Sequence, residues 1–307
     1  GVKIKSVPTF ENGKLNAIVY SVIATFLALF GRYDVIHFHA EGPCSMIWLP
    51  HLFGIHTVAT IHGLDWQRAK WGGFATKFLK FGEKTAAKYA DELIVLSEGT
   101  RDYFKKTYGR ETVFIPNGID VQNEKKADII TKKYGLEKDG YILFLARIVP
   151  EKGLHYLIDA FMQTDTDKKL VIAGGVSHSG EYAKQIHDMA KDDRIIFTGF
   201  VEGDELWELY YNCRMYVLPS DVEGMPISLL EAMACGCECL VSNIDTAKNV
   251  VGEYGYTFKK SDVNDLKNKL CEMLGKPKAD KAEQIEYVKN NYSWDEITDR
   301  TLELYKK

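Results

Sequence analysis

The sequence has no apolar run long enough to cross a membrane. The longest run is Ile18–Phe30, with 13 residues, whereas a spanning helix needs about 20. It follows no basic segment at the start of the chain and precedes no clear cleavage site, so it does not look like a signal peptide. We therefore expect a buried helix at this position and a cytoplasmic protein.

The sequence is also poor in cysteine and in net charge. Six cysteines in 307 residues are too few for a disulfide scaffold and fit a reducing compartment. A net charge of −4 argues against nucleic acid as the partner. Apolar residues make up 46% and charged residues 27%, as in globular proteins, and the length suggests two domains.

Several motifs with a known mechanism are missing. No G-x-x-x-x-G-K-[ST] segment occurs, which disfavours a P-loop nucleotidase, and no G-x-G-x-x-G follows a strand, which disfavours a nicotinamide dehydrogenase. Cys235, Cys237 and Cys239 have the wrong spacing for a metal knuckle. We interpret them as small core or turn residues.

Short β-rich runs alternate with helical patterns along the chain, which is typical of parallel α/β sheets. Strands are expected at residues 34–39, 57–61, 92–96 and 112–115, and again at 141–146, 169–173, 194–197, 215–218 and 238–242. We predict two Rossmann-like doubly wound domains that face a cleft, at residues 1–120 and 121–290, with ligands at the carboxyl ends of the strands. An amphipathic helix within 291–307 is expected to pack back toward the first domain.

The segment from Pro219 to Glu231 follows a predicted strand and opens a predicted helix. Pro226 suits the first helical turn, and the free N–H groups there form a site for phosphate. Gly224 allows the backbone to approach a ligand closely. Glu223 and Glu231 are placed to accept hydrogen bonds from sugar hydroxyls, although a pair of solvated carboxylates is the simpler interpretation of these two residues alone.

The segment Ala146–Gly153 has the same position after a strand and before a helix. Arg147 offers a planar fork for phosphate oxygens, and Lys152 offers a point charge. A surface salt bridge is the default for either residue alone. Together with the preceding segment, however, they form a candidate diphosphate clamp.

A third group of polar residues follows two strands of the first half. His37, His39 and Glu41 follow one strand, and His62 follows the next. A structural role is the common one for a histidine near a strand end. A zinc site from the three histidines is conceivable but has no cysteine pair to support it.

Basic residues are concentrated in the first half. Residues 1–120 hold 14 basic and 11 acidic residues, a net of +3, whereas the remainder has a net of −7. The segment Trp66–Ala90 contributes six basic residues, and its Phe74, Phe78 and Phe81 share one helical face. A basic amphipathic helix can bind an anionic membrane surface, on the inner face of the cell membrane in a cytoplasmic protein. The alternative is a core-facing aromatic stripe with solvated lysines.

These segments resemble the family 4 retaining glycosyltransferases of GT-B fold. Residues 219–242 are similar to the signature of that family, residues 146–153 to its phosphate loop, and residues 114–120 to its inter-domain segment. Residues 37–43 and 60–71 look like a bacterial subgroup that builds surface and capsular polysaccharides. The resemblance covers nearly the whole chain.

The resemblance implies sugar transfer from a nucleotide-diphosphate sugar to a lipid-linked or saccharide acceptor, with retained configuration and no essential metal or cofactor. Arg147 and Lys152 would bind the diphosphate and stabilise its developing charge. Glu223 would contact the sugar hydroxyls, Glu231 the ribose, and His62 the region of donor sugar and acceptor. The residues that would hold sugar, phosphate and base through the backbone or by proximity are Gly224, Met225, Pro226, Ile227 and Val201.

The chain also departs from the family pattern. Ala146 replaces a glycine, Glu238 replaces a proline, and the first βα units of the N-terminal domain have no counterpart, which suggests a truncated start at Gly1. We therefore keep two alternatives, a nucleotide-sugar-binding fragment without turnover and a GT-B sugar epimerase.

Overall fold

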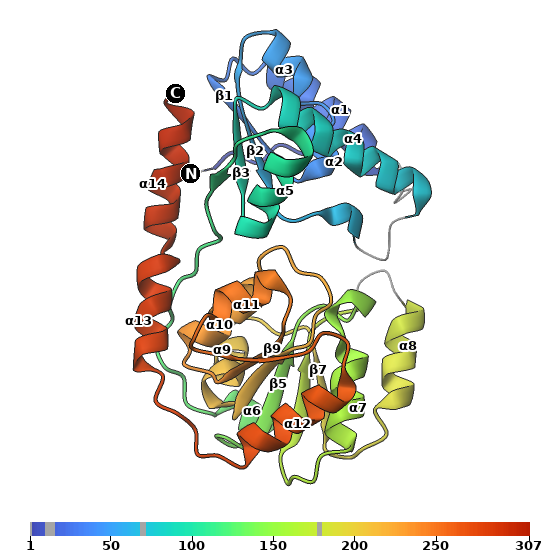
Figure 1. Cartoon of the computed structure of the whole chain (residues 1–307), viewed down its shortest axis with the longest axis vertical. Helices are drawn as coiled ribbons and strands as arrows, with labels where there is room; N and C mark the ends of the chain where they lie inside the picture. The colour runs from blue at the N-terminus through green and yellow to red at the C-terminus, as the bar shows by residue number, and fades with distance from the viewer. Residues whose placement is uncertain (1, 10–15, 68–71, 177–179) are drawn as a thin grey trace. The chain divides into compact units, whose positions relative to one another are not determined.

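The computed structural model describes residues 2–9, 16–67, 72–176 and 180–307 (Figure 1). The chain divides into two compact units. Unit 1 combines Gly1–Asn117 with Asp295–Lys307, and unit 2 contains Gly118–Trp294. Each unit has its own parallel sheet, so the predicted fold class of two parallel α/β sheets is confirmed.

Unit 1 is built on a four-stranded parallel sheet in the order β1-β2-β3-β4. The strands are β1 (Val35–His39), β2 (His56–Ile61), β3 (Glu92–Val95) and β4 (Val113–Phe114). The helical elements are α1 (Asn16–Leu29), α2 (Glu41–Cys44), α3 (Trp48–Leu52), η1 (Asp65–Gln67), α4 (Gly73–Tyr89), α5 (Glu98–Tyr108) and α14 (Trp294–Tyr305). From α14, Ile297 and Leu304 pack against Val58, Ile94 and Ile115 of the sheet region.

The expected helix at Ile18–Phe30 is present as α1, but the prediction that it is buried is wrong. Its buried residues are Ser21 and Thr25, whose hydroxyls donate to the backbone oxygens of Ala17 and Ser21 at 2.6 and 2.7 Å. The exposed large side chains are Tyr20, Phe26, Leu27 and Phe30. The run is apolar on nearly every side, so the sequence did not indicate which face would turn inward.

Helix α4 also turns a different face inward from the one that its aromatic spacing suggests. Phe74 and Phe81 are exposed, at 73% and 51%. The buried face consists largely of small residues, and a Cβ on Gly82 would lie 1.8 Å from the carbonyl oxygen of Glu41. The interpretation of these phenylalanines as core residues is therefore wrong, because α4 packs on α2 through glycine and alanine.

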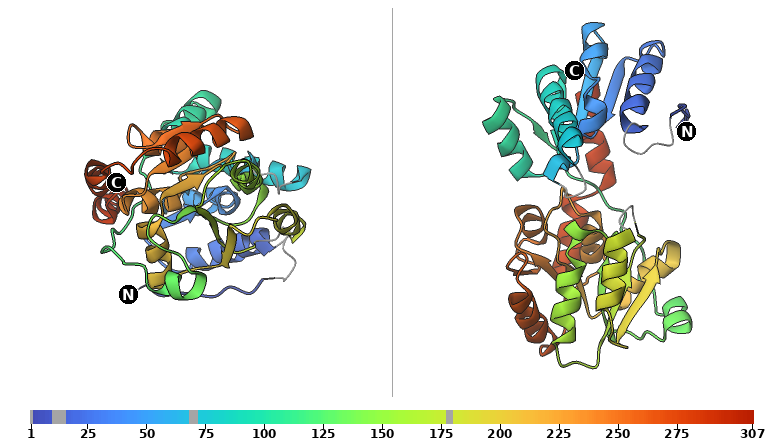
Figure 2. Two further views of the ribbon diagram at one scale, coloured as in Figure 1. Left: turned by 90° about the horizontal axis from the view of Figure 1, so that it is seen from below. Right: turned by 90° about the vertical axis from the view of Figure 1, so that its right-hand side faces the viewer.

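Unit 2 is built on a six-stranded parallel sheet in the order β10-β9-β8-β5-β6-β7. The strands are β5 (Tyr141–Leu145), β6 (Lys169–Ala173), β7 (Ile195–Gly199), β8 (Met215–Leu218), β9 (Cys239–Ser242) and β10 (Tyr256–Phe258). The helical elements are α6 (Ile129–Tyr134), η2 (Pro150–Lys152), α7 (Leu154–Met162), α8 (Gly180–Met189), α9 (Gly203–Asn212), α10 (Ile227–Ala234), α11 (Asp245–Val251), α12 (Val263–Leu274) and α13 (Ala282–Asn291). Helices cover both faces of this sheet (Figure 1, Figure 2).

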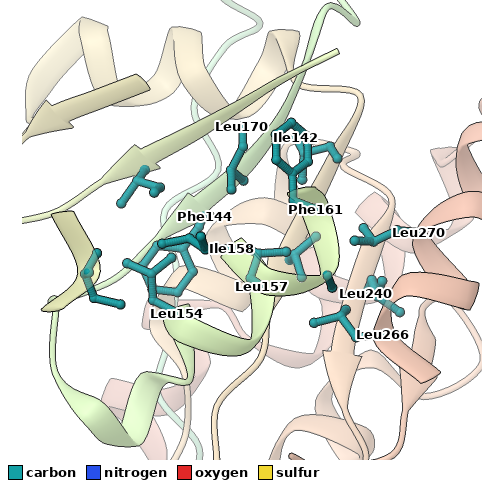
Figure 3. Packing of buried hydrophobic residues seen from close by; sticks show 14 of the residues in the cluster. Ile142, Phe144, Leu154, Leu157, Ile158, Phe161, Leu170, Leu240, Leu266 and Leu270 are labelled. Carbon is teal, nitrogen blue, oxygen red and sulfur yellow. The ribbon is translucent and has the colours of Figure 1, made fainter. Parts of the chain in front are cut away.

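The core of unit 2 is formed by apolar side chains of the central strands and of the helices packed on them. Figure 3 shows the group from β5, α7, β6, β9 and α12, namely Ile142, Phe144, Leu154, Leu157, Ile158, Phe161, Leu170, Leu240, Leu266 and Leu270. Strands buried on both faces explain the near-continuous apolar runs in this half of the sequence. Cys235, Cys237 and Cys239 are buried, which confirms their interpretation as core or turn residues.

Candidate functional site

The order of the strands in unit 2 defines where a ligand is expected. The chain moves from β5 outward to β6 and β7, then returns to place β8 on the other side of β5. In open parallel sheets, ligands bind outside the carboxyl ends of the strands at such a switch point. The loop after β5 carries Arg147 and Lys152, and the loop after β8 carries Glu223, so both predicted segments lie at the switch point.

The two loops are held together by backbone contacts that require glycine. Gly153 has a φ of +67°, and a Cβ on it would lie 2.0 Å from the carbonyl oxygen of Pro219. The N–H of Asp221 donates to the carbonyl oxygen of Glu151 at 2.9 Å. A side chain at position 153 would push the loops apart, and this close approach brings Lys152 next to Glu223.

Lys152 and Glu223 form an ion pair that is largely shielded from solvent. The Lys152 Nζ lies 2.6 Å from the Glu223 Oε1, and the two side chains are only 14% and 7% exposed. The hydroxyl of Ser220 donates to the same Oε1 at 2.6 Å. The sequence alone favoured a surface salt bridge for Lys152, but this pair is shielded from solvent. Burying a charge is costly unless it is paired, so each of the two side chains depends on the other.

Arg147 occupies the same loop but has a different environment. Its side chain is exposed, and within the described residues its guanidinium has no ion-pair or hydrogen-bond partner. Nearby, Gly174 has a φ of +147°, and a Cβ there would lie 1.9 Å from the carbonyl oxygen of Ala146. The exposed guanidinium thus extends from a tightly packed backbone, and its planar fork suits phosphate oxygens.

Helix α10 begins directly after the loop that carries Glu223. Pro226 is its N-cap residue and Ile227 its first residue, so the proline lies one position before the predicted first turn. Gly224 precedes Met225, which is 9% exposed, whereas Ile227 is 46% exposed. The first N–H groups of a helix have no acceptor within it and face the region in front of the N-terminus, where an anion is favoured.

Glu231 lies on the second turn of α10 and is half-buried. Its Oε2 accepts a hydrogen bond of 2.8 Å from the hydroxyl of Tyr210, a fully buried residue of α9. Burial raises the pKa of Glu231, and the hydrogen bond from Tyr210 partly offsets this shift. This environment does not match the alternative of a solvated helix glutamate.

Val201 lies just beyond β7 and is 8% exposed. The preceding Phe200 is 76% exposed, and its Cβ lies 3.9 Å from the position that a Cβ on Gly175 would take. The carboxyl ends of β6 and β7 thus present an aromatic ring and a buried valine next to each other.

The histidines of the third group form a row in unit 1. The rings of His37 and His39 stack with centroids 4.2 Å apart, and those of His39 and His62 with centroids 5.3 Å apart. The Nδ1 of His39 lies 3.1 Å from the Nε2 of His62. Burial and the neighbouring histidines lower the pKa of His37 to about 3. The rings contact one another rather than converging on a common point.

Among residues 2–9, 16–67, 72–176 and 180–307, no group of three histidine, cysteine, aspartate or glutamate side chains is placed to hold a metal ion. His37, His39 and His62, all described, do not make up such a group. None of the helices in this part of the chain has the length and apolar character needed to cross a bilayer.

The sequence alone missed the partners that orient the predicted residues. Ser220 supports Glu223, and its own backbone oxygen accepts from the hydroxyl of Ser242. Tyr210, which donates to Glu231, lies on a different helix, 21 positions earlier in the sequence. Ser220 lies inside the predicted segment and could have been named, whereas no sequence signal connects Tyr210 to the site.

Two family models match the chain. Residues 126–291 match "Glycosyl transferases group 1", and residues 1–123 match "Glycosyltransferase Family 4". The first match covers more than half of the sequence. The chain therefore belongs to the group 1 glycosyltransferases, a class of transferase enzymes.

Curated relatives support the same class. The chain is 26% identical to alpha-maltose-1-phosphate synthase of Mycolicibacterium smegmatis over 288 residues, which are 83% of this chain and 74% of the relative. It is 27% identical to O-antigen chain mannosyltransferase B of Escherichia coli over 187 residues, 58% of this chain and 48% of the relative. It is 27% identical to the UDP-Gal:alpha-D-GlcNAc-diphosphoundecaprenol alpha-1,3-galactosyltransferase of Escherichia coli over 259 residues, 78% of this chain and 66% of the relative. The matches thus span about half to three quarters of these relatives.

Solved structures show that the fold is of the GT-B type. The chain is similar to sucrose-phosphate synthase from Thermosynechococcus elongatus, with a TM-score of 0.83, 22% identity and coverage of 97% of this chain and 79% of the other. It is also similar to HepE of Anabaena in complex with UDP and glucose, with a TM-score of 0.81, 19% identity and coverages of 96% and 83%.

Proposed function

We propose that this chain transfers a sugar from a nucleotide-diphosphate sugar to a lipid-linked or saccharide acceptor, with retained anomeric configuration, in the synthesis of bacterial cell-surface glycans. The observation that carries the proposal is the pairing of Lys152 with Glu223 at the switch point of a parallel sheet, in the same loop as the exposed Arg147. Two cations suit a diphosphate, and the carboxylate suits sugar hydroxyls.

In the proposed donor site, different residues bind the diphosphate and the sugar. Arg147 and Lys152 bind the diphosphate and stabilise the negative charge that develops on it as it leaves. The backbone N–H groups of Gly224, Met225 and Ile227 add donors in front of α10, to which Pro226 contributes none, and the helix adds the positive end of its dipole. Glu223 accepts from donor-sugar hydroxyls, and its contact with Lys152 Nζ at 2.6 Å orients its carboxylate.

Retention follows if the acceptor attacks the same face of the sugar from which the diphosphate departs. The bond from the acceptor oxygen to the anomeric carbon forms while the bond from that carbon to the phosphate oxygen breaks. The acceptor proton passes to the departing phosphate oxygen, so the reaction needs no separate protein base. In this scheme the protein provides orientation and charge stabilisation.

The remaining predicted residues bind the rest of the substrate. Glu231 would accept from the ribose hydroxyls, and Val201 would lie near the base. His62, in unit 1, would contact the region of the donor sugar and the acceptor. Donor binding to unit 2 and the contribution of His62 can therefore be tested separately.

The experiment begins with thermal-shift and calorimetric titration of the full chain with UDP-, GDP- and dTDP-sugars. Transfer to lipid-linked and saccharide acceptors is then followed by NMR, which reads the anomeric configuration of the product. Glu223→Gln is expected to abolish transfer, whereas the matched surface variant Glu253→Gln leaves it unchanged. Failure of every nucleotide sugar to bind would contradict the donor site. Binding without turnover would favour the binding fragment, and an epimerised free sugar would favour the epimerase.

The exposed face of α4 supports a second part of the proposal, that unit 1 binds the anionic surface of the membrane from the cytoplasmic side. Phe74, Lys77, Phe81, Lys84 and Lys88 are all exposed and recur at helical spacing. Aromatic rings can enter the interface while lysines pair with acidic headgroups. The part of Trp66–Ala90 at residues 68–71 lies outside the described residues.

Sedimentation with vesicles tests this surface. The triple variant Lys77→Glu/Lys84→Glu/Lys88→Glu is expected to lose about 100-fold in affinity for phosphatidylglycerol vesicles, at roughly 1 kcal/mol per lysine. A matched variant reverses three exposed lysines of unit 2, Lys184, Lys191 and Lys289, and should bind as the wild type does. Equal binding of both variants would contradict the membrane surface and leave the donor site unaffected.

A further inference from the structure

We propose that His39 is a positioning residue that fixes the ring orientation and the tautomer of His62. This inference rests on the proposed function only for the catalytic importance of His62. The contact itself is a feature of unit 1 and is independent of any substrate.

The fold places the two rings together. His37 and His39 are two positions apart on β1, so their side chains leave the strand on the same face. His39 is paired in register with Thr60 of β2, and His62 follows two positions later, just after β2 ends at Ile61. The hydrogen bond of 3.1 Å between the Nδ1 of His39 and the Nε2 of His62 follows from this placement.

The other end of the row is anchored by two hydroxyls. The Nδ1 of His37 lies 2.6 Å from the hydroxyl oxygen of Tyr305 in α14, and its Nε2 lies 2.8 Å from the Oγ1 of Thr60. Both nitrogens of His37 are thus engaged, which fixes its ring plane. His39 stacks on this ring at 4.2 Å with an interplanar angle of 27°, so its own ring is held in turn.

The nitrogen-to-nitrogen bond couples the protons of the two rings. A neutral imidazole has one N–H and one acceptor nitrogen, so only one of the two facing nitrogens can carry a proton. If the Nδ1 of His39 donates, the Nε2 of His62 accepts and the proton of His62 is on its Nδ1. The reverse choice moves that proton to Nε2. His39 therefore decides which nitrogen of His62 can donate and which can accept.

The charges around the row favour neutral rings. Burial and the nearby His62 lower the pKa of His39. Burial and both neighbouring histidines lower the pKa of His37 to about 3. Tyr305, the titratable group that α14 presents to the row, has a raised pKa and stays protonated. Of the carboxyls that follow β1 and β2, Glu41 is buried, and Asp65 and Glu83 raise its pKa further. His37 and His39 are thus neutral near pH 7, and each carries its proton on one nitrogen.

The test compares two substitutions of His39 in the full chain. Asparagine presents one donor and one acceptor near the position of the imidazole Nδ1, so His39→Asn can keep the bond. Phenylalanine keeps a stacking ring but has no hydrogen-bonding atom, so His39→Phe removes it. His187→Asn, at a histidine of α8 in unit 2, is the matched control. The readout is the pair of imidazole ¹⁵N shifts of His62, assigned with His62→Gln.

We expect the wild type and His39→Asn to show one dominant tautomer of His62, and His39→Phe to show averaged shifts of both. In the transfer assay, His39→Phe should lower kcat about tenfold or more, since small misplacements of a catalytic group can cost about 100-fold. Its donor KM should stay within about twofold, because the diphosphate residues lie in unit 2. His39→Asn should restore most of kcat.

Unchanged ¹⁵N shifts of His62 in His39→Phe would overturn the inference, and so would an equal loss of kcat in both His39 variants. A wild-type chain that transfers no sugar, but whose His62 spectrum still depends on His39, would overturn the proposed function and support the positioning. The two hypotheses can therefore fail independently.

Discussion

At the scale of single residues, the two glutamates of the candidate site differ in their partners. Glu223 contacts Lys152 and accepts a hydrogen bond from Ser220, whereas Glu231 has one hydroxyl partner and a raised pKa. The two glutamates are only eight positions apart in sequence. Substitution of the partner, with the glutamate left in place, tests what each environment contributes.

Tyr210→Phe removes the hydroxyl that donates to Glu231 while keeping the buried ring. The pKa of Glu231 should rise further, because the hydrogen bond favours the charged form. A protonated carboxyl is a weaker acceptor for ribose hydroxyls, so donor affinity should fall as the pH decreases, and the fall should start at a higher pH in the variant. We expect a loss of about tenfold at pH 5.5 and less than about threefold at pH 8, measured by calorimetry.

The control for this prediction is Tyr134→Phe, which breaks another tyrosine–glutamate bond of unit 2, with Glu205, at 2.8 Å. It should leave the pH dependence of donor binding as in the wild type. Identical pH profiles for the wild type and Tyr210→Phe would contradict the role of Glu231.

A second buried carboxyl should make unit 1 sensitive to alkaline pH. Glu41 is fully buried, and neither of its oxygens has a hydrogen-bond partner among the described residues. Burial, Asp65 and Glu83 raise its pKa well above the usual range. The folded state therefore keeps a proton that the unfolded state releases above about pH 4.3, so the contribution of Glu41 to the free energy of unfolding decreases as the pH rises from there.

Glu41→Gln removes this titration at nearly constant shape. At pH 5 we expect the variant to be no more stable than the wild type. Between pH 5 and pH 8 the free energy of unfolding of the variant should rise by about 1–3 kcal/mol relative to that of the wild type. Urea unfolding at both pH values, followed by tryptophan fluorescence, measures the difference. Glu303→Gln, at an exposed glutamate of α14, should show no such change. A wild type whose stability increases from pH 5 to 8 relative to Glu41→Gln would refute the argument.

At the scale of elements, a buried ion pair connects the ends of β8, β9 and α12. The guanidinium of Arg214 contacts the carboxylate of Glu238 and donates to the carbonyl oxygens of Met273 and Lys276 at 2.6 and 2.8 Å. The other oxygen of Glu238 accepts from the N–H of Ala279 at 3.1 Å. Glu238, which stands where related sequences were expected to have proline, is therefore a structural residue.

Removal of one partner leaves the other charge buried and unpaired. Arg214→Met and Glu238→Leu should each destabilise unit 2 by about 3–5 kcal/mol, whereas the double variant should lose much less than the sum. A double-mutant cycle by urea unfolding gives the coupling energy. Additive losses would show that the carbonyl contacts of Arg214, rather than the ion pair, dominate.

Helices and strands were predictable from the sequence where their apolar pattern fits only one kind of element. Central strands such as β5 and β6 are apolar throughout and were located to within a residue or two. The orientation of α1 was not predictable, because a helix that is apolar on nearly every side has no single face that must be buried. Strand β10 has three residues, Tyr256–Phe258, and is too short for periodicity to detect. The short α10 was found because Pro226 and Gly224 mark its start.

At the scale of the whole molecule, the sequence predicted which loops follow the strands and carry the candidate residues, but not which distant residues contact them. Loops after strands are predictable, since parallel strands end at one edge of a sheet. The contact between Tyr305 and His37, for example, joins residues 268 positions apart. It forms because the C-terminal segment packs into unit 1 after the chain has passed through unit 2. Two segments separated by unit 2 thus form unit 1, and local patterns do not record such pairings.

That return has a testable consequence for stability. The last segment contributes Ile297 and Leu304 to the core of unit 1, and Arg300 donates to the carbonyl oxygen of Phe114 at 2.5 Å. Deletion of residues 295–307 should expose Val58 and Ile94 and destabilise unit 1 by several kcal/mol, at about 25 cal/mol per Å² of apolar surface. Hydrogen exchange should accelerate in β1–β4 and stay unchanged in β5–β10. Donor affinity should also persist, because the diphosphate residues lie in unit 2. Faster exchange in both sheets would instead show that the two units unfold as one cooperative structure.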